Sequence, residues 1–199
     1  MKRHNPYIRI EDVPPKKQKI EDNEPIYFYD AKEKPYGVFS NFYIAPKKEG
    51  MVLIEGKKYL STEHYYQCKK FDYPGANKFS LEYSNLIRNA KTPNLAFCLA
   101  NQVCNSPYPW AIKVRESIKL YEEKGVQIDE NWIENRDSVM CKAVLEKFKQ
   151  NERLKQILLN TKNRELIEHT SRDDYWADGG DGSGENKLGK TLMKVREIL

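Results

Sequence analysis

The segment of residues 61–71, STEHYYQCKKF, constrains the fold more than any other part of the chain. It begins with two hydroxyl residues, which cap a helix by accepting a hydrogen bond from a free backbone N–H. Glu63 then falls in the first helical turn, where the helix dipole favours a negative charge. Because Glu63, Gln67 and Lys70 are spaced i, i+4 and i+7, the pattern predicts that they share one helix face.

This pairing of an acid and an amine has a chemical interpretation and a structural one. Glu63 and Lys70 are about 10 Å apart along a helix axis, and side chains lean toward the helix N-terminus, so Lys70 reaches back toward Glu63. A carboxylate can move protons, and a desolvated amine can act as a neutral nucleophile. The alternative is a capped helix with solvated charges and an aromatic core side. Spacing alone leaves both interpretations open.

The composition predicts one domain whose cysteines are free thiols. The chain has 199 residues, is 39% hydrophobic and includes 13 Tyr, 7 Phe and 3 Trp, which can build a core. Its net charge of +5 permits an anionic partner without requiring one. The four cysteines form no C-x-x-C pair, so we expect free thiols, no metal site and no cofactor. No signal peptide or membrane-length apolar run is visible, which predicts a soluble intracellular protein without a membrane partner.

Residues 1–25 are polar, contain prolines and lack periodicity, which predicts a disordered tail before a domain at 26–199. Two basic groups in it, Lys2-Arg3 and Lys16 to Lys19, resemble a bipartite nuclear-import signal. The alternative is a charged tail on a cytoplasmic protein.

The remaining periodicity predicts a helix-rich α+β domain with a few short strands. Strands are expected at 26–29 and 165–168, with a hairpin at 51–60 before the helix described above. Residues 36–43 are aromatic and interrupted by glycine, so they fit a strand end or a binding loop. Helices are expected at 92–101, 111–123, 131–149, around 154–158 and at 187–199.

The glycine- and aspartate-rich loop at 171–189 contains a motif that we reject. Residues 184–191, GENKLGKT, match the nucleotide-binding pattern G-x-x-x-x-G-K-T letter for letter. A P-loop follows a buried strand, however, and the preceding residues are glycine and aspartate. The spacing of the carboxylates also fails to match an EF-hand calcium loop. A glycine-rich turn before a helix can still bind phosphate through its N–H groups, or it can simply cap the last helix.

Six segments, taken in order, resemble the NADAR family, which includes N-glycosidases of riboflavin-pathway intermediates and hydrolases that remove ADP-ribose from guanine bases. The resemblance covers residues 26–199 but not the tail. One departure is Ala177, because the family pattern has glycine after the tryptophan, which leaves the geometry of that turn open. The matching segments lie at 36–42, 61–71, 139–148, 158–161, 168–176 and 184–196.

The resemblance implies that Lys70 forms a Schiff base with C1 of the sugar and that Glu63 shuttles protons. Burial and the neighbouring Lys69 would favour the neutral amine that this chemistry needs. Asp173 would position the ribose or assist the departing base. Trp176 fits a stacking surface for the base, or a core tryptophan. The residues predicted to bind the substrate are Phe39, Ser40, Asn41, Tyr66, Gln67, Trp176, Gly179, Gly180 and Asn186.

The resemblance leaves three functions to weigh. The basic charge and the tail favour ADP-ribosylated nucleic acid, with the ADP-ribose linked to guanine, as substrate. The second candidate is a small ribosyl nucleotide, a phosphoribosylaminopyrimidine intermediate of riboflavin synthesis. The third is a non-catalytic module that binds ADP-ribose, which has no need of an amine facing a carboxylate.

Overall fold

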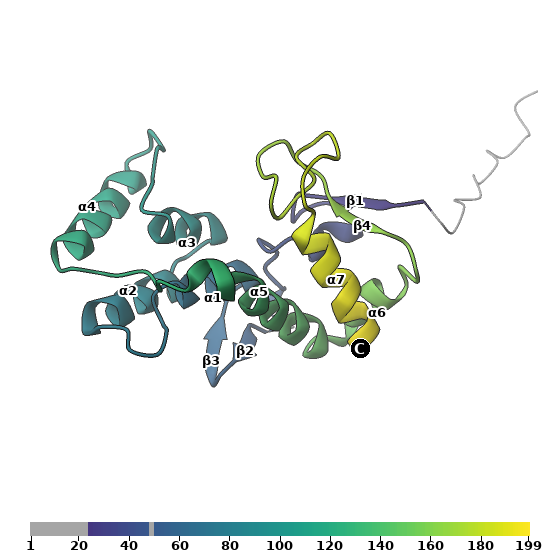
Figure 1. The fold of residues 1–199 in the computed structure, drawn as a ribbon, viewed down its shortest axis with the longest axis horizontal. Helices are drawn as coiled ribbons and strands as arrows, with labels where there is room; N and C mark the ends of the chain where they lie inside the picture. The colour runs from purple at the N-terminus through teal and green to yellow at the C-terminus, as the bar shows by residue number, and fades with distance from the viewer. Residues whose placement is uncertain (1–23, 48–49) are drawn as a thin grey trace, which may run out of the picture.

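A computed structural model describes residues 24–47 and 50–199 as one helix-rich α+β domain (Figure 1), which confirms the predicted fold class. The predicted import motif lies outside the described residues. None of the helices in the described ranges is long and apolar enough to cross a membrane. The elements in chain order are β1 (Ile26–Phe28), the 3-10 helix η2 (Tyr36–Phe39), β2 (Val52–Ile54), β3 (Lys57–Tyr59), α1 (Thr62–Lys69), α2 (Lys78–Arg88), α3 (Pro93–Ala100), α4 (Trp110–Glu123), α5 (Trp132–Lys149), α6 (Glu152–Leu159), β4 (Leu166–Glu168) and α7 (Lys187–Ile198).

The predicted helix starts are explained by local capping. The Ser61 hydroxyl accepts a hydrogen bond from the backbone N–H of His64 at 3.4 Å and so caps α1. Thr92 caps α3 in the same way, and Pro93 occupies the first helical position, where its missing N–H costs nothing. These short polar contacts are local in sequence, and for that reason the sequence pattern located both starts.

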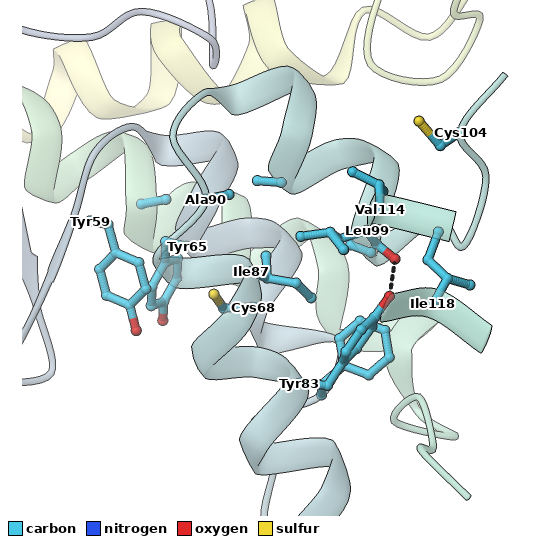
Figure 2. Close-up of a cluster of buried hydrophobic side chains, with 14 of the residues drawn as sticks. Tyr59, Tyr65, Cys68, Tyr83, Ile87, Ala90, Leu99, Cys104, Val114 and Ile118 are labelled. Atoms are coloured by element: carbon cyan, nitrogen blue, oxygen red, sulfur yellow. Dashed lines mark hydrogen bonds between the residues drawn. The ribbon is translucent and has the colours of Figure 1, made fainter. Parts of the chain in front are cut away.

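Helices α1 and α5 run through the middle of the molecule and divide its core into two parts (Figure 1). On one side, α1 packs against α2 and α3, and Figure 2 shows that cluster, in which the Tyr83 hydroxyl donates a 2.7 Å hydrogen bond to the Leu99 carbonyl. On the other side, Met140, Val144 and Phe148 of α5 pack with β1, β4 and α7. Burial on both sides fixes the rotation of α1, and therefore the direction in which its polar residues point.

The strands β1 and β4 form a parallel pair, with Phe28 beside Glu168, although about 140 residues separate them in the chain. The β2–β3 pair is the predicted antiparallel hairpin. The segment expected to be a strand end or a loop contains the 3-10 helix η2 instead. Its Gly37 lies against the backbone of Ala31, where a Cβ would meet the carbonyl oxygen at 2.7 Å, so this close approach requires glycine.

Helix α7 is held against β4 by an asparagine and a glycine. The Asn186 side chain donates to the Leu166 carbonyl at 2.9 Å and accepts from the Glu168 N–H at 3.1 Å. Gly189, one turn further on, approaches so closely that a Cβ there would overlap the Leu166 carbonyl oxygen. The absence of a side chain at position 189 therefore sets the distance between α7 and the strand that precedes the Gly-rich loop.

Replacing Gly189 by alanine is expected to lower the free energy of unfolding by about 3 kcal/mol, because the methyl group overlaps backbone that cannot move freely. Helix propensity alone predicts the opposite sign, a gain of about 1 kcal/mol. Urea denaturation of Gly189→Ala, with the exposed Lys190→Ala on the same helix as control, measures the difference. A Gly189→Ala protein as stable as the wild type would contradict the close approach of α7 to β4.

Candidate active site

The acidic end of the site is built on the first turn of α1. Glu63 is buried, with 5% of its surface exposed, and its carboxylate accepts a 2.7 Å hydrogen bond from the Gln67 amide. Its backbone N–H donates to the Asn41 carbonyl at 3.1 Å, and the Thr62 hydroxyl donates to the same carbonyl. Asn41 therefore anchors the start of α1 through its backbone carbonyl.

The basic end of the site is Lys70, which directly follows α1 and retains helical backbone angles. Its Nζ donates to Asn101 Oδ1 at 2.9 Å, at the end of α3. It also lies 6.0 Å from the ring centre of Tyr66 and 5.9 Å from that of Trp132, the first residue of α5. The Lys70 carbonyl accepts the Asp129 N–H at 2.8 Å, which ties this point of the chain to the start of α5.

Burial sets the charge states of both groups. It lowers the pKa of Lys70 to about 8, and the nearby Glu63 charge opposes this shift. Burial raises the pKa of Glu63 to about 7, while the Gln67 hydrogen bond and Lys70 act in the opposite direction and Asp173 adds to the rise. Burial lowers the pKa of Lys70 as predicted, whereas the Lys69 amine pairs with Glu55 at 3.6 Å and is not among the groups that shift this pKa.

A third component comes from the loop after β4. Asp173 Oδ1 accepts hydrogen bonds from the backbone N–H groups of Tyr175 and Trp176, at 2.9 and 2.7 Å. The Trp176 ring meets the Tyr66 ring edge to face at 5.4 Å between ring centres. The loop thus brings Asp173 close enough to affect the pKa of Glu63, and it places Trp176 beside Tyr66 of α1. The structure thus brings four of the predicted residues to the surroundings of Glu63 and Lys70, namely Tyr66, Gln67, Asp173 and Trp176. Their contacts with substrate stay predictions.

Several residues predicted to bind the substrate are occupied by contacts within the fold. The Gly179 N–H donates to the Asp173 carbonyl and the Gly180 N–H to Asp178 Oδ1, so neither is left for a phosphate. Both glycines have positive φ, and a Cβ on Gly180 would meet Ser171 at 2.9 Å. Asn186 uses both polar side-chain atoms to join α7 to β4. These residues shape the loop, and their predicted ligand contacts remain without direct support.

The end of η2 and the residues that follow it support the site through contacts within the fold. Phe39 is fully buried, stacked on Tyr36 with ring centres 5.5 Å apart, and so offers no surface to a ligand. The Ser40 hydroxyl accepts the Phe42 N–H, and the Ser40 carbonyl accepts a 2.9 Å hydrogen bond from the buried Lys147 amine. In this structure the contacts of Phe39 and Ser40 fix the position of the segment that carries Asn41.

One buried polar atom in the site has no partner. Gln67 is 3% exposed, and its Nε2 binds Glu63, but its Oε1 accepts no hydrogen bond from the described residues. An unpaired buried acceptor costs about 1–3 kcal/mol. A ligand hydroxyl or N–H would satisfy this atom, which is consistent with the prediction that Gln67 binds substrate.

Two residues that complete the surroundings of Lys70, Asn101 and Trp132, were not predicted from the sequence. Both lie at helix ends, and the periodicity of a helix does not predict which residues of other helices its ends will contact. The turn at Ala177, whose geometry the sequence left open, accommodates the alanine. That residue is buried and is absent from the positions with positive φ, so alanine fits the turn without strain.

The rejected nucleotide-binding motif is explained by the fold. Its threonine, Thr191, donates its hydroxyl to the Lys187 carbonyl inside α7, and Lys190 is exposed. Residues 169–186, which precede the helix, form a loop rather than a buried strand. Among the residues that the structure describes, no group of three or more His, Cys, Asp or Glu side chains is arranged to hold a metal ion.

Replacing Asn101 by aspartate is expected to move the rising limb of the pH–activity profile to higher pH. A carboxylate beside the Lys70 amine favours its charged form and raises its pKa, which depletes the neutral amine near pH 7. Measuring kcat/KM from about pH 6 to about pH 10 tests this, with Asn101→Leu as the uncharged comparison. Identical profiles for the wild type and Asn101→Asp would show that the Lys70 amine beside Asn101 does not govern this limb of the profile.

Comparison with known proteins finds relatives along most of the chain. The chain is 33% identical to the N-glycosidase YbiA of Escherichia coli over 87% of this chain and 88% of YbiA. It is also 33% identical to an N-glycosidase of Nostoc punctiforme over 87% of this chain and 92% of that protein. A riboflavin biosynthesis protein of Vibrio vulnificus shares 34% identity over 88% of this chain but only 39% of its own length.

The fold is similar as well. The NMR structure of E. coli YbiA superposes with a TM-score of 0.64 at 31% identity, covering 92% of this chain and 89% of YbiA. The relatives' names confirm the predicted enzyme class, an N-glycosyl hydrolase. The family profile described as NADAR domain matches residues 27–199. On this extent of sequence and structural agreement, the chain belongs to the NADAR domain family.

Proposed function

We propose that the chain removes ADP-ribose from guanine bases of nucleic acid, with Lys70 as nucleophile and Glu63 as proton carrier. The observation that carries the mechanism is the buried Lys70 amine, which lies beside the Tyr66 and Trp132 rings and within electrostatic range of the Glu63 carboxyl. A lysine whose pKa is about 8 is partly neutral near pH 7, whereas an exposed lysine is almost entirely charged. Neutral amines attack carbonyl-level carbons, and C1 of a ribose is such a carbon.

The reaction proceeds in two stages. The Lys70 amine forms a bond to C1 while the bond between C1 and the base nitrogen breaks, and the electron pair of that bond stays on the nitrogen. The amine passes a proton to Glu63, and the sugar ring opens to a Schiff base as the ring oxygen takes up a proton. Water then adds to C1 and releases Lys70, so that one water is consumed for each bond hydrolysed.

The aromatic side chains suit a planar leaving group. Tyr66 and Trp132 pack with ring centres 4.9 Å apart, and Trp176 meets Tyr66 from the loop side. Such rings stack on bases with about 1–3 kcal/mol per base. Two backbone N–H groups of its own loop hold Asp173, which supports the proposal that its carboxylate accepts a hydrogen bond from a ribose hydroxyl.

Charge supports a nucleic-acid substrate. The chain carries 34 basic and 29 acidic residues, and this excess attracts a polyanion through its phosphates. A second candidate has support from the comparisons, because one relative is named a riboflavin biosynthesis protein. That name favours a phosphoribosylaminopyrimidine, which presents the same ribosyl N-glycosidic bond to the same residues. A module that only binds ADP-ribose is disfavoured by the buried amine and carboxyl.

The deciding experiment offers both substrates to the wild type. An oligonucleotide carrying guanine-linked ADP-ribose and a phosphoribosylaminopyrimidine are incubated separately, and mass spectrometry follows release of the free base or the unmodified strand. We expect the unmodified oligonucleotide to be released at least about a hundredfold faster than the phosphoribosylaminopyrimidine is hydrolysed. The reverse ranking would assign the chain to riboflavin intermediates, and binding of free ADP-ribose without any turnover would favour a binding module.

A further inference from the structure

Glu168 is the last residue of β4, and its backbone is fixed on both sides. Its N–H donates to Asn186 Oδ1 at 3.1 Å, and its carbonyl accepts the Asp178 N–H at 2.9 Å. Side chains alternate along a strand, so Glu168 shares a face with Leu166, which is fully buried in the cluster that includes Tyr66. The strand therefore directs the Glu168 side chain to the buried face of the β1–β4 pair, the side of the cluster that includes Tyr66.

The surroundings of this carboxyl are acidic. It lies within electrostatic range of Glu63 on α1 and of Asp173 and Asp178 in the loop after β4. Burial, and then these three carboxyls, raise the pKa of Glu168 to about 8. Within residues 24–47 and 50–199, no group hydrogen-bonds its side-chain oxygens. Near pH 7 Glu168 is thus a protonated acid whose proton no neighbour among these residues holds.

A ligand is expected at this place for an independent reason. Gln67, on the same side of α1 as Glu63, keeps its buried Oε1 without a partner among the described residues. The half-buried Glu168 carboxyl and this buried acceptor both belong to the surroundings of Glu63, and no described residue hydrogen-bonds either of them. A substrate that brings both an acceptor, such as a base nitrogen, and a donor, such as a ribose hydroxyl, would satisfy them together.

We propose that Glu168 is the general acid that protonates the departing base, a role that rests on the N-glycosidase reaction proposed above. As the bond from C1 to the base nitrogen breaks, its electron pair remains on the nitrogen, and the carboxyl proton of Glu168 moves to the base. The base leaves neutral, and Glu168 is left as a carboxylate. The water that hydrolyses the Schiff base supplies the proton that restores the acid.

The two glutamates then divide the work by position. Glu63 faces Lys70 and opposes the fall in the pKa of that amine, so it is placed to take the proton that Lys70 sheds. Glu168 interacts with Glu63, Asp173 and Asp178, but it is not among the groups that shift the pKa of Lys70. Two carboxyls whose surroundings differ in this way suit the separate tasks of base and acid.

A comparison of leaving groups tests the acid role. Glu168→Gln is measured on the guanine-linked substrate and on 4-nitrophenyl ribofuranoside 5-phosphate, whose nitrophenolate leaves without a proton. We expect kcat to fall by about a hundredfold or more on the first substrate and by less than about threefold on the second. The matched control is Asp174→Asn, an exposed carboxyl of the same loop. Equal losses on both substrates would reduce Glu168 to a structural role and overturn the proposal.

The pH profile gives a second readout. In the wild type kcat/KM is expected to fall above about pH 8 as Glu168 loses its proton, and Glu168→Gln should lack this alkaline fall. A variant that keeps the fall would contradict the assignment.

Failure of the proposed substrate is distinguished in the same series. A wild type inactive on guanine-linked ADP-ribose but active on the phosphoribosylaminopyrimidine refutes that substrate, and the leaving-group comparison is then made with the pyrimidine. Carbon-13 NMR titration of labelled glutamate carboxyls in the free enzyme, assigned with Glu168→Gln, needs no substrate. A Glu168 midpoint near the ordinary glutamate range would overturn the acid role whatever the substrate.

Discussion

Alanine in place of Lys70 is expected to lower turnover by about a thousandfold or more and to abolish trapping of the enzyme by borohydride. The variant lacks the amine that bonds to C1, so no Schiff base exists for borohydride to reduce. Free ADP-ribose is a convenient probe, because its open form presents an aldehyde at C1. Mass spectrometry of the wild-type protein after reduction should place one added sugar on the peptide that contains Lys70.

Two further variants separate chemistry from folding and charge. Lys69→Ala removes the neighbouring amine, which is paired with Glu55 rather than directed into the site, and should keep both turnover and trapping. Lys70→Arg keeps a cation beside Asn101, but a guanidinium stays charged and does not attack C1, so it should be inactive. Full turnover by Lys70→Ala, or a trapped sugar on another lysine, would refute the assignment of the nucleophile.

Local sequence patterns predicted most of the secondary structure. The serine before α1, the threonine and proline at α3 and the apolar stripe of α5 each act within a few residues, and the corresponding helices begin where expected. The pairing of β1 with β4 across the chain carries no local signal. The 3-10 helix η2 also went unpredicted, because the need for glycine at position 37 comes from contact with Ala31.

From residue spacing alone, the candidate site was predictable only along α1. Glu63, Gln67 and Lys70 lie on or directly after that helix, so their spacing in the sequence is enough to imply that they lie close together. Asn101 and Trp132 reach Lys70 from the ends of other helices, and only tertiary packing brings those ends together.

In the Gly-rich loop, the sequence suggested a binding role for groups that are hydrogen-bonded within the fold. Its composition suggested phosphate binding, yet the fold itself consumes the N–H groups of Gly179 and Gly180 and the amide of Asn186. A loop with many possible donors looks the same in sequence whether those donors face a ligand or each other.

Glutamine in place of Glu63 is expected to separate the two halves of the reaction. The substitution keeps the shape of the side chain but removes the proton carrier, so turnover should fall by about a hundredfold to ten-thousandfold. Loss of the negative charge removes an influence that raises the pKa of Lys70, so the amine becomes more neutral.

Glu63→Gln should therefore still form a Schiff base with free ADP-ribose, detected by borohydride, although it turns over slowly. In the wild type, Glu63 ionises near its pKa of about 7 and Lys70 loses its proton near its pKa of about 8, so kcat/KM should rise across this interval. The rise assigned to Glu63 should be absent in the variant, while the step assigned to Lys70 moves to lower pH. If Glu63→Gln loses trapping as completely as Lys70→Ala, then Glu63 is needed even for the aldehyde of free ADP-ribose, and the prediction that the Lys70 amine stays reactive without it is wrong.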